Sequence, residues 1–213
     1  MLRPKFKICG IKTIDTIDCC IDNNVDFFGL TFYKTSPRNI EIIEAIKLVS
    51  YSQHKPIIPV GVFVNKPILE LLELIKQTNL NYIQLHGEEN FDYILNLKEK
   101  INLKVIKNIG ISSIKDLDKI KFFPNVDYFL FDYKPTKKEL PGGNAKQFDW
   151  NLLKNINIKQ PWFLSGGINI DNIKEIYKYI IPYGIDISSG VEGHKGIKSL
   201  DKINKLFKFF DAN

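Results

Sequence analysis

Residues 162–168 read Trp-Phe-Leu-Ser-Gly-Gly-Ile, and residues 185–191 read Ile-Asp-Ile-Ser-Ser-Gly-Val. Each stretch is a short apolar run followed directly by small residues and glycine, and each precedes a helical pattern, near 169–179 and 200–209. A short apolar run bounded by glycine is typical of a buried strand in a parallel sheet. The two stretches therefore predict the last two strand–helix units of an α/β protein.

The same unit recurs six times upstream, within a chain of 213 residues. Eight units favour closure into a (β/α)₈ TIM barrel, a single domain over residues 1–213. The alternative is an open doubly wound sheet, which six units would suit better. The predicted strands are 6–9, 26–32, 57–64, 82–85, 103–107, 127–131, 162–164 and 185–187, and the predicted helices lie near 14–23, 41–50, 68–78, 88–99, 114–121, 149–155, 169–179 and 200–209.

The composition indicates a cytoplasmic protein without a membrane span. Hydrophobic residues make up 44% of the chain, and no apolar run approaches the ~18 residues that a membrane helix needs. The N-terminus runs straight into the first predicted strand and lacks a signal-peptide core. Three cysteines, an odd number, form no disulfide framework, and no Cys/His spacing resembles a metal site.

The net charge of +6 raises the possibility of a nucleic-acid binder. However, the lysines are spread along the whole chain rather than clustered with aromatic residues. We therefore expect no nucleic-acid partner. Arginine is almost absent from this Lys-rich chain, and only Arg3 and Arg38 remain.

Glycine and serine after the last two predicted strands indicate a phosphate site. Ten of the 13 glycines follow predicted strands, the end where barrel enzymes keep their active sites. Backbone N–H groups at the start of a helix bind anions, so we expect a small-molecule phosphate ester as substrate; two ordinary glycine turns are the alternative. The predicted cradle comprises Ser165, Gly166, Gly167, Ser188, Ser189 and Gly190, and Gly142 and Gly143 could close over it from the sixth loop.

Two strand ends carry candidate catalytic groups. Cys9 ends the first strand and can act as a general base if its thiolate is favoured, although a buried cysteine is more often a small hydrophobe. Asp132 follows the apolar sixth strand, where partial desolvation would raise its pKa and make it a general acid. An ion pair with Lys134 is the alternative for Asp132. Cys19 and Cys20, in the first predicted helix, are interpreted as packing residues.

Two further side chains are candidates for substrate binding. Arg38 lies in the loop after the second strand, and its planar fork suits a carboxylate on the substrate; a surface arginine is the alternative. His86 ends the fourth strand, where it would serve binding or packing rather than catalysis.

Taken together, these motifs resemble those of the phosphoribosylanthranilate isomerase family, in unbroken order over nearly the whole chain. They are Lys7-Ile8-Cys9-Gly10, Ser36-Pro37-Arg38, Val60-Gly61-Val62-Phe63-Val64-Asn65, Gln84-Leu85-His86-Gly87, Asp132, Gly142-Gly143 with Phe148-Asp149-Trp150, Ser165-Gly166-Gly167 and Asp186-Ile187-Ser188-Ser189-Gly190-Val191-Glu192.

The resemblance implies an Amadori rearrangement in tryptophan biosynthesis, carried out without a metal or organic cofactor by a chain that we expect to be a monomer. It implies Asp132 as the acid that opens the furanose, Cys9 as the base that takes the C2′ proton, and Arg38 as the contact for the anthranilate carboxylate.

This sequence departs from the family pattern in two places. Asn144-Ala145 replace a small hydroxyl residue and a glycine, and Lys195-Gly196-Ile197-Lys198-Ser199 replace Pro-Gly-x-Lys-Asp in a stretch that we expect to be peripheral. Rival functions are a sugar-phosphate epimerase, the related isomerase of histidine synthesis and a non-catalytic phosphate binder. The histidine enzyme is built on two aspartates, so Cys9 argues against it.

Overall fold

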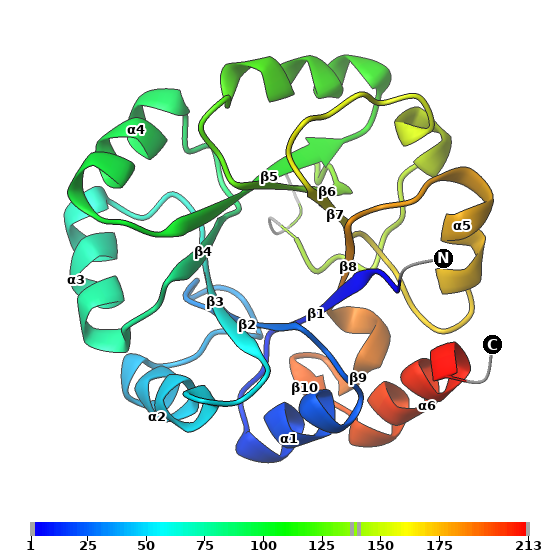
Figure 1. Ribbon diagram of the computed structural model, residues 1–213, viewed down its shortest axis with the longest axis horizontal. Helices are drawn as coiled ribbons and strands as arrows, with labels where there is room; N and C mark the ends of the chain where they lie inside the picture. Colours follow the sequence, from blue (N-terminus) through cyan, green and yellow to red (C-terminus); the bar gives the residue numbers. More distant parts are fainter. Residues whose placement is uncertain (1–2, 137–138, 140–141, 212–213) are drawn as a thin grey trace.

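The computed structural model (Figure 1) describes residues 3–136, 139 and 142–211. Eight parallel strands close into a barrel in sequence order, because β1 pairs with both β2 and β8. The predicted TIM barrel is confirmed, and the open sheet is excluded. The strands are β1 (Lys5–Cys9), β2 (Phe27–Thr31), β3 (Ile58–Phe63), β4 (Tyr82–Leu85), β5 (Lys104–Ile111), β6 (Tyr128–Tyr133), β7 (Trp162–Leu164) and β8 (Gly184–Ile187).

Helices surround the barrel as an outer ring (Figure 1). The connections of the first half are regular α-helices, whereas those of the second half are mostly short 3₁₀-helices. The α-helices are α1 (Ile14–Asp22), α2 (Ile42–Ser52), α3 (Ile68–Thr78), α4 (Phe91–Lys100), α5 (Ile176–Tyr179) and α6 (Leu200–Asp211), and the 3₁₀-helices are η1 (Ile114–Phe122), η2 (Trp150–Leu153), η3 (Ile173–Glu175) and η4 (Ser189–Val191). A two-stranded hairpin, β9 (Glu192–His194) and β10 (Ile197–Lys198), was not predicted.

Local side-chain chemistry sets several helix ends. Thr13 caps α1 by accepting from the backbone N–H of Thr16, and Asn90 caps α4 in the same way. The helix predicted near 169–179 begins late, because the side chain of Asn172 accepts from the backbone N–H of Asn169 and holds a turn before η3.

β5 runs four residues further than predicted. Its pairing with β6 continues through Gly110, opposite Asp132, and Ile111, opposite Tyr133. Gly110 therefore lies inside a strand rather than after one, and it does not belong with the loop glycines. The longer β5–β6 ladder carries Asp132 to the mouth of the barrel.

The apolar core has two parts. A large cluster packs between the strands and the helical ring and includes Cys20, and a small one fills the barrel interior with Phe27, Val60, Ile106, Leu130 and Phe163. Cys19 and Cys20 are both buried in the large cluster, as predicted. Because the second cluster closes the interior near the strand N-termini, the residues above it are free to be polar.

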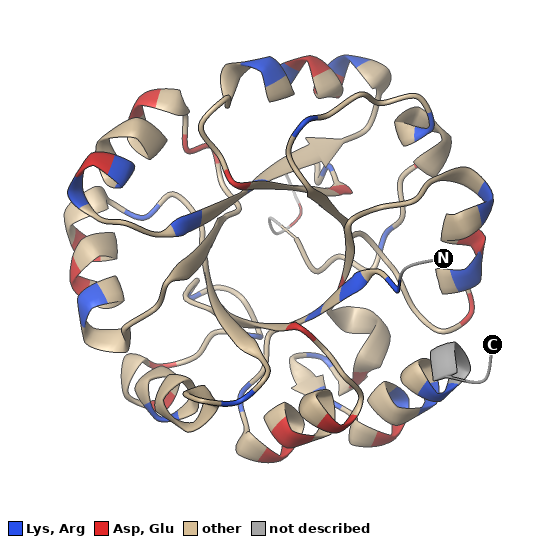
Figure 2. Cartoon of the chain, in the orientation of Figure 1, with Lys and Arg blue, Asp and Glu red and all other residues tan. Residues whose placement is uncertain are grey.

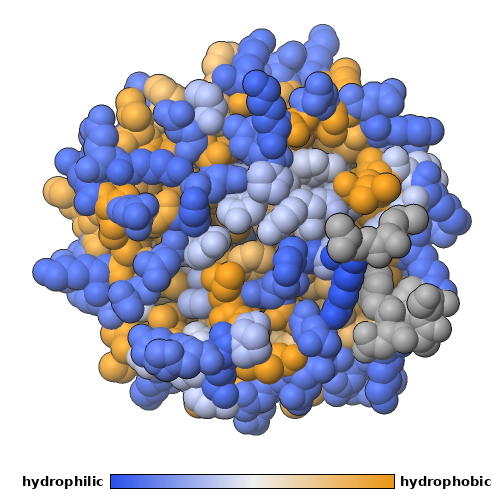
Figure 3. Space-filling model, in the orientation of Figure 1, coloured by the Kyte–Doolittle hydropathy of each residue, from blue (hydrophilic) through white to orange (hydrophobic). Residues whose placement is uncertain are grey.

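The charged residues of the helical ring are of both signs and are intermixed around it (Figure 2). On the face shown in Figure 3, hydrophilic residues predominate and hydrophobic ones are scattered among them. Among the described residues, no helix is both long and apolar enough to cross a bilayer.

Candidate active site

The predicted site residues converge at the C-terminal end of the barrel strands. One cavity is lined by eight of them, and an adjoining cavity shares five of these with it, namely Asp132, Gly142, Gly143, Ser165 and Ser188. The eight are Cys9, Arg38, His86, Asp132, Gly142, Gly143, Ser165 and Ser188, while the adjoining cavity adds Gly166, Gly167 and Ser189. Gly190 lines a third hollow on the outer side of the same loops.

Cys9 owes its place to strand alternation. Ile8 points outward into the helix-facing core, so Lys7 and Cys9 point into the barrel. Cys9 is paired in register with Gly29 of β2, and a Cβ on Gly29 would lie 2.7 Å from Sγ of Cys9. The missing side chain at Gly29 therefore makes room for the thiol.

Opposing influences act on the Cys9 thiol. Burial is the largest and raises its pKa, whereas the positive charges of Lys7 and Lys198 lower it. The net effect is a raised pKa. Lys7 is fully buried, and its Nζ donates to Oδ1 of Asp186 at 2.9 Å. The thiol thus borders a buried ion pair whose cation favours the thiolate.

Asp132 has the environment of a general acid. Burial raises the pKa of its carboxyl to about 7, although the backbone N–H of Tyr133 donates to Oδ1 at 2.7 Å and opposes this. The charge of Asp186 raises the pKa further. Lys134, the alternative partner, instead pairs with Asp116 at 2.5 Å. A substantial fraction of Asp132 therefore carries a proton at neutral pH.

His86 is neutral in this site. Its Nε2 lies 3.6 Å from Oδ2 of Asp132, a spacing that suggests an ion pair. However, burial and the charges of Lys7 and Lys107 lower the pKa of His86 to about 3, so it carries no charge at neutral pH. The side-chain amide of Gln84 lies 2.8 Å from Nδ1, so Nε2 is the ring nitrogen that faces Asp132.

Arg38 is buried rather than a surface arginine. Its Nε and Nη2 donate to the two carboxylate oxygens of Glu192, at 2.7 and 2.9 Å. The bidentate carboxylate partner in the structure thus comes from the chain itself. A Cβ at Gly143 would collide with Nη1, so this third nitrogen faces the sixth loop, beside the cavity.

Within residues 195–199, Lys198 is not peripheral, contrary to our expectation. The side chain of Lys198 is 2% exposed, and its Nζ donates to Glu192 at 2.9 Å and to the backbone oxygen of Ser188 at 2.9 Å. The expectation was wrong because the hairpin folds back under Arg38, which places β10 against the end of β8.

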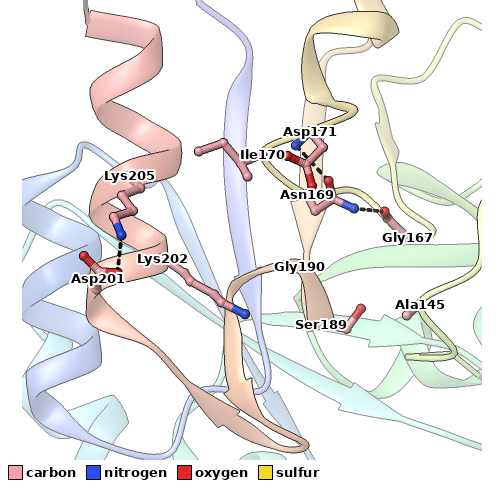
Figure 4. A pocket seen from close by; sticks show the side chains of 10 residues that line it. All are labelled: Ala145, Gly167, Asn169, Ile170, Asp171, Ser189, Gly190, Asp201, Lys202 and Lys205. Atoms are coloured by element: carbon pink, nitrogen blue, oxygen red, sulfur yellow. Dashed lines mark hydrogen bonds and ion pairs between the residues drawn. The ribbon is translucent and has the colours of Figure 1, made fainter.

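The loops after β7 and β8 pack tightly together at the predicted phosphate cradle. A Cβ on Gly190 would collide with the backbone oxygen of Ile168, and Gly166 and Gly167 have φ values of +96° and +63°. Figure 4 shows the outer side of these loops, where Lys202 and Lys205 of α6 line the same hollow as Ser189 and Gly190. We expected a helix to begin directly after each of these strands. Instead, β8 is followed by η4, a turn of three residues, and η3 begins only several residues after β7.

Residues 142–146 of the sixth loop lie over the mouth of the site. A Cβ on Gly142 would lie 2.6 Å from Nε2 of His86, and a Cβ on Gly167 would meet the backbone of Ala145 and Lys146. Gly142 and Gly143 have positive φ values of 79° and 69°, which glycine adopts readily. This segment therefore lies close both to His86 and to the loop after β7.

Sequence reasoning missed five residues of the site, namely Lys7, Gly29, Asp186, Glu192 and Lys198. A signal for Lys7 existed: it alternates with Cys9, so it had to point into the barrel and needed an anionic partner. Within the described residues, no group of three or more His, Cys, Asp or Glu is arranged to hold a metal ion.

Comparison with known proteins gives a consistent result. The family model described as N-(5'-phosphoribosyl)anthranilate (PRA) isomerase matches residues 6–209. An N-(5'-phosphoribosyl)anthranilate isomerase of Rhizobium johnstonii is 38% identical over 213 residues, covering 99% of this chain and 94% of that protein. The protein of the same name from Thermoanaerobacter pseudethanolicus is 41% identical over 198 residues, 92% of this chain and 94% of its own length.

Solved structures agree. Phosphoribosyl anthranilate isomerase from Thermotoga maritima superposes with a TM-score of 0.85 at 30% identity, covering 99% of this chain and 100% of that one. A phosphoribosyl anthranilate isomerase in complex with reduced 1-(o-carboxyphenylamino)-1-deoxyribulose 5-phosphate superposes with a TM-score of 0.81 at 28% identity, with 99% and 100% coverage.

Proposed function

Since this chain belongs to the N-(5'-phosphoribosyl)anthranilate isomerase family, we propose that Cys9 is its general base and Asp132 its general acid. The chain converts N-(5'-phosphoribosyl)anthranilate to 1-(2-carboxyphenylamino)-1-deoxyribulose 5-phosphate in tryptophan biosynthesis. The observation that carries the assignment of roles is that the thiol and the carboxyl line one cavity at the barrel mouth.

The rearrangement proceeds by proton transfers. Asp132 protonates the furanose ring oxygen, and the bond from that oxygen to C1′ breaks as the anthranilate nitrogen lone pair forms a C1′=N bond. The Cys9 thiolate then removes the proton from C2′, and the released electron pair forms the enolamine. Tautomerisation moves a proton from the C2′ hydroxyl to C1′ and gives the ketose. Each step balances without an oxidant or a reductant.

The two ends of the substrate meet different parts of the rim. Arg38 contacts the anthranilate carboxylate with the nitrogens that Glu192 leaves available. The loops after β7 and β8 bind the phosphate through Ser165, Gly166, Gly167, Ser188, Ser189 and Gly190, while Gly142 and Gly143 cover the bound sugar. His86 donates from Nε2 to the substrate or to Asp132. Tight loop packing at Gly190 and the buried Arg38 support this division.

The test is rescue of a tryptophan-requiring strain that lacks this isomerase. The chain should restore growth without tryptophan, and the purified protein should turn over N-(5'-phosphoribosyl)anthranilate generated from ribose 5-phosphate and anthranilate. A Cys9→Ala/Asp132→Asn double variant serves as the control and should fail in both assays. Failure of the unmodified chain in the purified assay would reject the function.

Further expectations concern the cell and the assembly. Three free cysteines suit a cytoplasmic enzyme. We also propose a monomer, because the most exposed apolar side chains come from separate elements, among them Leu69 of α3 and Phe122 of η1. The T. maritima protein is described both as a dimer and as generated monomers, so light scattering on this chain is the deciding measurement.

A further inference from the structure

Three charged side chains meet behind the active-site cavity, where the β9–β10 hairpin folds against Arg38. Glu192 begins β9 and Lys198 ends β10, so the hairpin brings an anion and a cation together. The side chains of Arg38, Glu192 and Lys198 are 8, 6 and 2% exposed. Burying three charges requires a compensating arrangement, because each loses its hydration.

Glu192 satisfies that requirement with four donors. It accepts from Nε and Nη2 of Arg38, from Nζ of Lys198 at 2.9 Å and from the backbone N–H of Gly196 at 3.1 Å. The donors from Arg38 and Lys198 outweigh the effect of burial and lower the pKa of Glu192 to about 2. The carboxylate is therefore ionised at any physiological pH.

This contact fixes the orientation of the Arg38 guanidinium. When two nitrogens of one guanidinium bind the two oxygens of one carboxylate, the plane of the guanidinium is fixed. Such a bidentate pair has little freedom to rotate. The third nitrogen, Nη1, faces Gly143 beside the cavity. Glu192 thus decides where Arg38 presents the donors that remain for a ligand.

Lys198 decides how much charge Arg38 presents. With Glu192 alone, the cluster of one cation and one anion would be neutral. Lys198 adds a second cation, so Arg38, Glu192 and Lys198 together keep one positive charge next to the cavity. In a buried place such a charge is weakly screened and attracts a substrate anion strongly.

The same lysine connects the cluster to the strand that carries the base. Its Nζ donates to the backbone oxygen of Ser188 at 2.9 Å and lies 3.3 Å from Oγ of the same residue. Oγ of Ser188 in turn donates to the backbone oxygen of Cys9 at 3.0 Å. These hydrogen bonds hold the carboxylate-binding side of the site in a fixed position relative to the end of β1.

We propose that Glu192 and Lys198 are positioning residues that set Arg38 for the carboxylate of the substrate, Glu192 by fixing the guanidinium plane and Lys198 by preserving one net positive charge. The inference rests on the proposed contact between Arg38 and that carboxylate. It makes the hairpin a determinant of specificity for amines that carry an acid group, although neither residue touches the sugar.

The experiment compares two substrates on each protein. N-(5'-phosphoribosyl)anthranilate carries the carboxylate, and N-(5'-phosphoribosyl)aniline, made from ribose 5-phosphate and aniline, lacks it. The measured quantity is the ratio of kcat/KM for the anthranilate compound to kcat/KM for the aniline compound. Because both values come from one preparation, the fraction of folded protein cancels, and a variant that folds poorly still gives a valid ratio.

Lys198→Met should lower this ratio by about tenfold, through a higher KM for the anthranilate compound, because the net positive charge beside the cavity is lost. Glu192→Gln should lower it by a similar factor although it adds a positive charge, because the amide no longer fixes the guanidinium plane with two acceptor oxygens. Lys198→Arg should restore the ratio to within about threefold, because the charge returns. Lys195→Met removes the same charge from an exposed position of the same hairpin and should change the ratio less than about twofold.

The outcomes separate the two proposals. If Arg38→Met lowers the ratio while Lys198→Met and Glu192→Gln leave it unchanged, Arg38 binds the carboxylate but the positioning role is wrong. If Arg38→Met itself leaves the ratio unchanged, the proposed contact and the inference built on it both fail. A purely structural role for the hairpin predicts equal losses on both substrates and an unchanged ratio.

Discussion

Nε2 of His86 and Oδ2 of Asp132 lie 3.6 Å apart, and burial moves their two pKa values in opposite directions. It lowers the pKa of His86 to about 3 and raises that of Asp132 to about 7. The histidine is therefore neutral at pH 7 and adds nothing to the charges of Lys7 and Arg38, which favour the ionised carboxylate. Burial therefore keeps the proton on the proposed acid up to neutral pH, and the neutral histidine adds no positive charge that would oppose this.

The pH dependence of kcat/KM should follow from this pair of groups. The productive enzyme needs a protonated Asp132, whose pKa is about 7, and an ionised Cys9, whose pKa is raised. Below pH 7 most of Asp132 is protonated, but the fraction of Cys9 that is ionised becomes very small. Above the pKa of the thiol, Cys9 is ionised, but the fraction of Asp132 that is protonated becomes very small. The product of the two fractions falls on both sides, so a pH–rate series should show its maximum on the alkaline side of about pH 7. A maximum below pH 6 would contradict the assignment.

Asp132→Asn should lower turnover and yet stabilise the fold at alkaline pH. A carboxyl with a raised folded pKa contributes stability below its ordinary pKa near 3.8 and loses it as the pH rises toward about 7. The neutral amide avoids that loss, and the gain at pH 8 should be on the order of a few kcal/mol in urea unfolding.

The matched control is Asp127→Asn, because Lys98 and Lys104 help to lower the pKa of that carboxyl. This variant should lose stability at neutral pH, so its change in unfolding free energy should have the opposite sign to that of Asp132→Asn. Equal effects of the two substitutions at pH 8 would mean that the buried carboxyl carries no penalty.

Cys9→Ala should lower kcat by at least the ~10²–10⁴ that a single proton-transfer group contributes. The matched control is Cys19→Ser, since Cys19 is buried on α1 and donates to the backbone oxygen of Leu200 and to Asn204, away from the active-site cavity. Steady-state kinetics on both variants gives the answer. Near-normal turnover of Cys9→Ala would remove the thiol from the mechanism.

Gly29→Ala should impair catalysis through crowding of the thiol. The new Cβ would lie 2.7 Å from Sγ and 3.0 Å from Cα of Cys9, so the side chain or the strand must shift. Gly193→Ala is the control, because a Cβ there meets its nearest neighbour at 3.6 Å. We expect kcat to fall at least tenfold in Gly29→Ala, given the sensitivity of proton transfer to about 1 Å of misplacement, and to hold in Gly193→Ala. Equal kcat values in the two variants would show that the thiol tolerates the intrusion.

The barrel itself could be predicted from the sequence because eight short apolar runs alternate with helical patterns. β4 and β7 have the predicted limits, since polar or glycine residues bound both runs closely. β5 was predicted too short, because its last residues are held by pairing with β6, a contact between segments that the local pattern does not encode. The 3₁₀ character of η1 and η2 was likewise not foreseen.

For the site, strand ends were predictable and long-range partners were not. Cys9, Asp132 and His86 follow directly from where strands end. The pairing of Glu192 with Arg38 could not be predicted in this way. The two residues are 154 positions apart, and the β9–β10 hairpin has no apolar pattern that would indicate a pair of strands. Gly29 was overlooked because its importance lies in Cys9, its neighbour on the adjacent strand, and its own strand shows no sign of this.

The two-part core has a consequence for how such a barrel can diverge. The apolar contacts that hold the chain together lie between the strands and the helices and in one layer near the strand N-termini, away from Cys9, His86 and Asp132. Because these three residues belong to neither apolar cluster, exchanging them opens no void in either one. The proposed catalytic residues and the residues that stabilise the fold are thus different, so descendants of one ancestral barrel can acquire new chemistry while they keep the same scaffold.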